Sequence, residues 1–158
     1  IGDVHYEVAA HLGREKLANM PGLNEFTAAM EKVFNAADPD GLALFAAFKS
    51  MPLAEDTPAR AMQLAASLRE FRGSAHLIAI RAVGLTSKQA HYVKRPNDVK
   101  GFGWGEDDAP VVDDQVRALM VQAENLTDAL CIPAYSVLNE AERKALVDGA
   151  KAFESALK

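Results

Sequence analysis

Apolar side chains recur every three or four residues along almost the whole chain, and this spacing is typical of amphipathic helices. The N-terminal segment shows it in Val4, Val8 and Leu12, which would share one buried helix face. Residues 97–111 form a long irregular stretch, and the alternation typical of strands is confined to a short candidate piece near residues 99–104. The sequence therefore predicts an all-α fold of about seven helices around a central helix, with at most a trace of β structure.

Proline and capping residues predict where several helices begin and end. Thr57 and Pro58 form an N-cap and first-turn pair, which opens a long central helix over residues 58–83. Pro39 suits the first turn of an earlier helix, because its missing N–H would lack a helical partner there anyway. A later long helix is expected to stop at Pro133, since proline removes a hydrogen bond inside a helix.

The 158 residues are enough to bury one core, so the sequence predicts a single all-helical domain over residues 1–158. A net charge of −5 argues against nucleic acid or an anionic membrane as a partner of the whole molecule. No apolar run approaches the ~20 residues of a membrane helix. The single cysteine, Cys131, excludes an internal disulfide and is expected to pack in the core. These features together favour a cytoplasmic location.

The positive charge is concentrated in the middle of the chain, where residues 69–100 hold 7 Lys and Arg against 2 Asp and Glu. The helical phase places Arg69, Arg72 and His76 in one sector of about 60°, beside Gly73. Buried charge needs partners, so this stripe has either a structural or a functional explanation. In the structural interpretation the stripe is satisfied by nearby carboxylates, namely those of Glu70, Asp56 or Glu55.

The functional interpretation is a site for a small anionic or polar ligand. Arginine donates hydrogen bonds in pairs to anions, and histidine can donate or accept. The aromatic residues of the GFGW segment would cover this site. The predicted ligand-binding residues are Arg69, Arg72, Gly73, His76, Phe102 and Trp104. No cofactor is expected, and His5 and His11 lack the spacing of metal ligands, so no metal is expected either.

A second group of basic residues follows the central helix and could contact a nucleic acid backbone. This basic patch consists of Lys88, His91, Lys94, Arg95 and Lys100. The alternative interpretation is a solvated surface that pairs with the acidic segment at residues 106–114.

The stretch LREFRGSAHLIAIRAVGL at residues 68–85 resembles the signature L-R-E-H-R-G-D-G-H-x-A-A-L-x-x-A-G-L. This signature belongs to a largely uncharacterised, actinomycete-type bacterial helix-turn-helix family that is related to winged-helix proteins. Further similarity is found in GFGW and in QVRALMVQAENLTDAL, so the resemblance covers about residues 42–157. It implies a transcriptional regulator that binds DNA.

The chain also departs from the family pattern. Ser74 and Ala75 replace the Asp and Gly of the signature, and GWGEDDAPVVDDQ runs almost directly into the last long helix of the resemblance. The recognition helix and wing are therefore expected to be missing or degenerate, and the acidic replacement would repel phosphates. Because the usual N-terminal part of the family also has no counterpart, the chain, which begins at Ile1, is expected to be a fragment.

Three functional hypotheses remain from the sequence. The first is a regulator-like helical protein that binds a small molecule and whose DNA reading is weakened or lost. The alternatives are a DNA-binding transcriptional regulator, and an enzyme that uses Arg72 and His76 on an unknown substrate. The apolar faces also suggest that a second copy of the chain, or a missing N-terminal segment, covers part of the surface.

Overall fold

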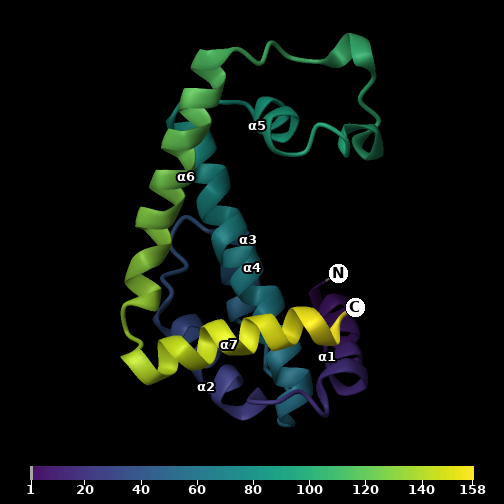
Figure 1. The fold of residues 1–158 in the computed structure, drawn as a ribbon, viewed down its shortest axis with the longest axis vertical. Helices are drawn as coiled ribbons and strands as arrows, with labels where there is room; N and C mark the ends of the chain where they lie inside the picture. The colour runs from purple at the N-terminus through teal and green to yellow at the C-terminus, as the bar shows by residue number, and fades with distance from the viewer. Residues whose placement is uncertain (1) are drawn as a thin grey trace. The chain divides into compact units, whose positions relative to one another are not determined.

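The computed structural model describes residues 2–158, except for the side chains of Lys100 and Glu106, and over this range it contains only helices. The prediction of an all-α fold with about seven helices is confirmed (Figure 1). The α-helices are α1 (Gly2–Leu17), α2 (Leu23–Ala36), α3 (Ala43–Lys49), α4 (Thr57–Ala82), α5 (Ser87–Lys94), α6 (Asp114–Tyr135) and α7 (Glu140–Ala156). Two short 3-10 helices, η1 (Val99–Phe102) and η2 (Glu106–Asp108), lie between α5 and α6. The candidate strand near residues 99–104 is wrong, because η1 occupies this position.

Contacts within the chain group into two compact units. The first unit runs to Ser74 and also contains Cys131–Lys158, and the second unit is Ala75–Leu130. Helices α4 and α6 contribute residues to both units. The expectation of one domain over residues 1–158 stays a prediction.

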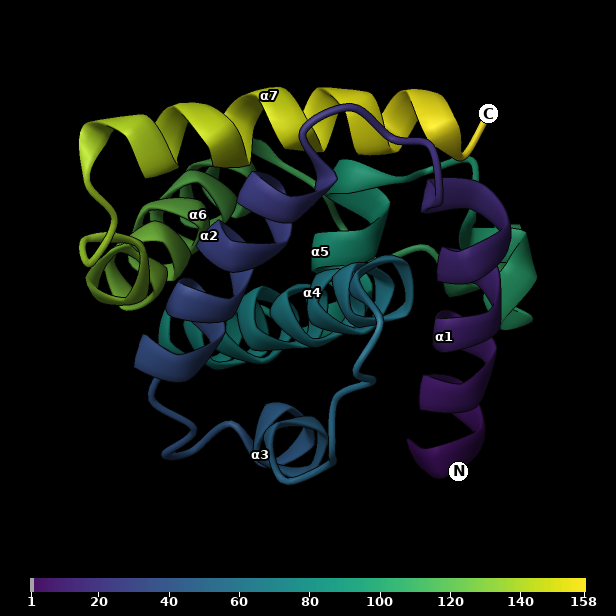
Figure 2. The same cartoon turned by 90° about the horizontal axis from the view of Figure 1, so that it is seen from below.

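The first unit is built around the N-terminal part of α4, which is buried among the surrounding helices. Leu64, Leu68 and Phe71 line its inner face, and the Phe71 ring lies 5.0 Å from the ring of Phe45 in α3. Helix α7 lies against α2 (Figure 2). At this contact a Cβ on Gly149 would lie 2.4 Å from ring atoms of Phe26, so the close approach requires glycine.

Helix α1 buries a different face from the one that the spacing of its valines predicted. Its buried residues are Tyr6, Ala9, Ala10, Gly13 and Leu17. Val4 and Val8 are instead 62% and 61% exposed, so their assignment to a buried stripe is wrong. The physical reason is a polar anchor: the Tyr6 hydroxyl lies 2.6 Å from the Ser67 hydroxyl of α4 and fixes the rotation of α1.

Three of the predicted helix boundaries shift by a few residues. Helix α3 begins only at Ala43, so Pro39 precedes it in a turn that Leu42 N–H closes on the Pro39 carbonyl. Helix α4 is capped by Asp56, whose carboxylate accepts from Ala59 N–H at 3.2 Å. Helix α6 continues through Pro133 to Tyr135, so the loss of one backbone N–H at Pro133 does not end it.

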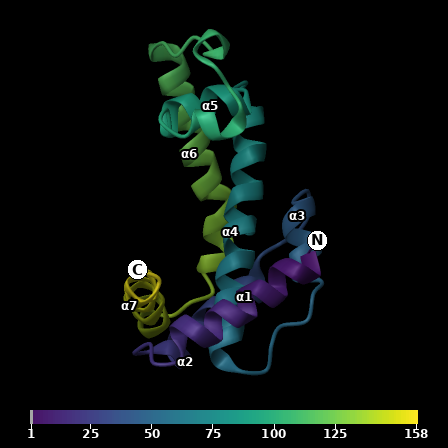
Figure 3. The same ribbon diagram turned by 90° about the vertical axis from the view of Figure 1, so that its right-hand side faces the viewer.

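The second unit packs the end of α4 against α5 and the longer part of α6, and Figures 1 and 3 show α4 and α6 side by side there. Its buried core includes Ile80, Leu85 and Met120. Gly84 has a φ of 88°, a left-handed conformation that ends α4 as a glycine C-cap does. Thr86 then opens α5 through a reciprocal pair of hydrogen bonds with Gln89.

Candidate functional site

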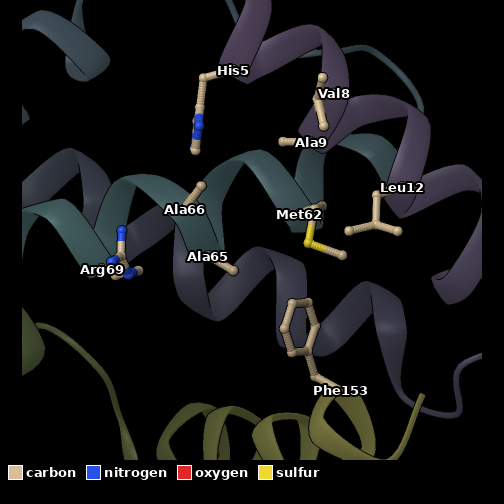
Figure 4. Close-up of a pocket in the computed structure, with 9 residues that line it drawn as sticks. All are labelled: His5, Val8, Ala9, Leu12, Met62, Ala65, Ala66, Arg69 and Phe153. Carbon is tan, nitrogen blue, oxygen red and sulfur yellow. The ribbon is translucent and has the colours of Figure 1, made fainter. Parts of the chain in front are cut away.

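The first unit contains an apolar pocket of about 310 Å³ between α1, α4 and α7 (Figure 4). Nine described residues line it: His5, Val8, Ala9, Leu12, Met62, Ala65, Ala66, Arg69 and Phe153. Most of these side chains are apolar. The pocket can therefore hold the hydrocarbon part of a small molecule.

Small residues on the facing helices leave the space that forms this pocket. Ala9 of α1 and Ala65 and Ala66 of α4 occupy positions where larger side chains would fill it. The two helices meet closely at Gly13, where a Cβ would lie 2.2 Å from the Pro58 carbonyl oxygen. This contact brings α1 onto α4.

The two polar side chains at the pocket are both basic. The Arg69 guanidinium donates to the Glu70 carboxylate at 2.5 Å, and 78% of the Arg69 side chain is exposed. The His5 ring packs edge-on against Phe48, with ring centroids 5.3 Å apart. None of the nine described lining residues is acidic, so the pocket has an apolar interior and two basic side chains at its edge, of which Arg69 is paired with Glu70.

The predicted Arg69, Arg72 and His76 stripe divides between the two units. Arg69 lines the pocket, whereas Arg72 and Gly73 are exposed on the same helix. His76 belongs to the second unit, where its Nδ1 lies 2.8 Å from the Thr127 hydroxyl. Because this hydroxyl donates to the Ala123 carbonyl at 2.7 Å, it accepts a hydrogen bond from His76. The structure therefore gives His76 a structural partner in α6.

The charge of Arg72 interacts electrostatically with the Tyr135 hydroxyl of α6. Burial raises the pKa of the Tyr135 hydroxyl, the nearby Cys131 raises it further, and the positive charge of Arg72 lowers it. Among the carboxylates expected to satisfy the stripe, Glu70 pairs with Arg69. Asp56 pairs instead with Arg14 of α1, at 2.7 Å.

The aromatic segment of the predicted site packs on α5 in the second unit. The rings of Phe102 and Trp104 stack at 5.1 Å, and His91 approaches Phe102 edge-on at 4.5 Å. Tyr92 adds a hydrogen bond from its hydroxyl to the Gly105 carbonyl at 3.3 Å. The expectation that this segment covers the arginine stripe stays a prediction, because the segment belongs to the second unit and the two arginines belong to the first.

The predicted basic patch is partly neutralised by acidic side chains of the same unit. Lys88 pairs with Asp108 at 3.4 Å, and Lys94 pairs with Glu124 at 2.7 Å. A hydrogen bond from Gly105 N–H and the Lys88 ammonium lower the pKa of the Asp108 carboxyl. Arg95 is exposed, and the Lys100 side chain lies outside the described residues. The pairing of Lys88 agrees with the interpretation that the acidic segment neutralises the patch.

No group of three or more His, Cys, Asp or Glu side chains in residues 2–158 could hold a metal ion. None of the described helices is both long and apolar enough to span a bilayer. Cys131 is buried, as its expected packing role requires.

Residues 1–104 match a helix-turn-helix family. The chain belongs to this family. No curated protein and no solved structure gives a significant match. The matched range differs from the expected residues 42–157, because it includes α1 and α2 and ends before α6. It contains α4, the turn at residues 83–86 and α5, together with every pocket residue except Phe153.

The pocket itself was missed by the sequence reasoning, apart from Arg69. Its apolar residues have the same spacing as core residues, and the sequence does not say which of two apolar faces of α1 is covered. The one available signal was Tyr6, whose hydroxyl needs a partner when buried and which therefore marks the inward face.

Proposed function

We propose that this chain is a small-molecule-binding member of the helix-turn-helix family, in which DNA reading is weakened. The observation that carries the proposal is an apolar pocket whose lining side chains are partly exposed to solvent. Val8 lines it and is 61% exposed, although Leu12, Met62 and Phe153 lie around the same opening (Figure 4). A ligand that covers these side chains would remove apolar surface from water.

The volume of the pocket sets the size of the ligand. Binding sites for small molecules occupy about 300–1,000 Å³, and the value of about 310 Å³ lies at the lower end. At roughly 20–30 Å³ for each non-hydrogen atom, the pocket holds a molecule of about 10–15 such atoms. This is the size of a small metabolite.

Weakened DNA reading is supported by the electrostatics of the second unit. The ion pairs of Lys88 and Lys94 reduce the positive charge that α5 can offer to phosphates. The net charge of −5 adds long-range repulsion. Nonspecific binding depends on the counterions that free Lys and Arg side chains release from DNA, so each internal ion pair weakens it.

The direct test is a titration with 1-octanol, followed by NMR spectroscopy of the isotope-labelled chain. We expect saturable shifts in α1, in residues 62–69 of α4, and near Phe153. Ala66→Leu should weaken the binding at least several-fold because the added side chain enters the pocket. Ala82→Leu is the matched control, since Ala82 is exposed on α4 and belongs to the second unit.

The proposal fails if 1-octanol gives no saturable shifts, or if Ala66→Leu binds it as well as Ala82→Leu does. Circular dichroism of both variants must first show unchanged helix content, so that lost binding reports the pocket. A change of molecular mass in solution that depends on Val8 would instead identify a second copy of the chain as the occupant.

A further inference from the structure

We propose that the pocket selects a medium-chain carboxylate, with the hydrocarbon chain between α1 and α4 and the carboxylate at Arg69. This inference rests on the proposed function and specifies the class of ligand. It follows from the uneven distribution of charge around the pocket.

The pocket has one basic and one apolar end. Figure 4 shows Arg69 at one side of the opening, with Met62 and Leu12 toward the other. Arg69 follows Met62 by two helical turns, a rise of about 10 Å along α4. An eight-carbon chain with bonds of about 1.5 Å spans roughly 9 Å when extended, so its carboxylate reaches Arg69 when its methyl end lies near Met62.

The Arg69 side chain can bind a carboxylate without losing its partner in the protein. A guanidinium has five N–H donors, and the hydrogen bond to Glu70 uses the terminal nitrogen Nη1. The Glu70 side chain is only 15% exposed, so this pair anchors one edge of the guanidinium on α4. The remaining donors can serve a ligand carboxylate.

The same distribution of charge disfavours other end groups. An ammonium group would meet the guanidinium of Arg69. The Glu70 carboxylate beside it is only 15% exposed and already paired with Arg69, and none of the nine described lining residues is acidic. A hydroxyl group would be tolerated, because it can accept a hydrogen bond from Arg69 or His5, but it would lack the Coulombic attraction. The order of affinity expected is therefore carboxylate, then alcohol, then ammonium.

The experiment compares octanoate, 1-octanol and octylammonium by NMR titration at low salt and pH 8. Because Arg69 is largely exposed, octanoate should bind roughly 3- to 5-fold more tightly than 1-octanol, as expected for a screened ion pair. Octylammonium should bind more weakly than both. The preference for octanoate should shrink in 0.5 M NaCl, where screening is stronger.

Arg69→Gln should remove the preference for octanoate over 1-octanol, because glutamine keeps a hydrogen-bond donor for the hydroxyl group but carries no charge for the carboxylate. Arg143→Gln is the matched control, because it makes the same charge change at an exposed position of α7 that does not line the pocket. This control should keep the full preference.

The outcomes separate the two proposals. If 1-octanol binds and octanoate binds no better, the carboxylate inference is overturned and the small-molecule proposal stands. A preference that survives in Arg69→Gln also overturns the inference. If neither compound binds, both proposals fail.

Discussion

Replacing Gly13 by alanine should destabilise the first unit, because α1 lies directly on the start of α4 at this residue. The new Cβ would lie 2.2 Å from the Pro58 carbonyl oxygen and 3.0 Å from the Ala59 Cα. An ordinary contact needs at least about 3.4 Å, so the helices must separate by roughly 1.2 Å at this point. Overpacking of this kind costs about 3 kcal/mol against backbone, and alanine returns about 1 kcal/mol of helix propensity. The expected net loss is about 2 kcal/mol.

Gly73→Ala is the matched control, since it is the same substitution at an exposed glycine inside α4. A Cβ there meets no atom within 4 Å, so only the propensity gain remains, about 0.5–1 kcal/mol. Thermal unfolding followed by circular dichroism at 222 nm should show Tm lowered by about 4–8 °C for Gly13→Ala and raised by about 1–4 °C for Gly73→Ala. Equal effects of the two substitutions, or a Gly13→Ala chain as stable as the parent, would refute the close contact between α1 and α4.

Two further predictions concern acid stability and DNA. The pKa of the Asp56 carboxyl is lowered first by its hydrogen bond from Arg14, and that of Glu142 by its hydrogen bond from Lys32. Because the folded pKa values lie below the ordinary values of 3.8 and 4.5, these carboxylates stabilise the fold above that range and lose the effect as pH falls below it. Thermal unfolding at a series of pH values should therefore show a Tm that begins to decline near pH 4.5. This decline should be smaller in the Asp56→Asn variant. In anisotropy titrations at 50 mM salt, duplex DNA should bind no more tightly than about 10⁻⁶ M, and tight binding that weakens in a Lys94→Ala, Arg95→Ala double variant would contradict weakened DNA reading.

The helical fold could be predicted because periodicity, turns and caps all point to the same elements. Thr86 and Asn139 each cap a helix through a reciprocal pair with a residue three positions later, and both signals are local in the sequence. The error at Pro39 has a different origin. A proline is compatible both with the first turn of a helix and with the turn before it, and tertiary packing decides between them.

The rotation of α1 was harder to predict, because two faces of this helix are apolar. Spacing by four residues marks Val4, Val8 and Leu12 as one face, whereas the buried face is made mostly of alanine and glycine around Tyr6. Small residues contribute little to a hydrophobic pattern, yet they allow α1 to approach α4 closely. The pattern of large apolar residues therefore predicted burial for a face of α1 that is largely exposed.

The wrong prediction of the buried face of α1 also explains why the sequence did not indicate the pocket. An exposed valine by itself is ordinary, since apolar atoms make up more than half of a protein surface. At Val8, however, exposure coincides with an apolar pocket in which the facing positions of α4 are the small residues Ala65 and Ala66. A surface selected only for packing would fill this space with larger side chains, at a gain of about 0.8 kcal/mol for each buried methylene group. These positions instead carry small side chains beside the exposed guanidinium of Arg69. This is the physical reason to expect an occupant with a hydrocarbon chain and a negative end.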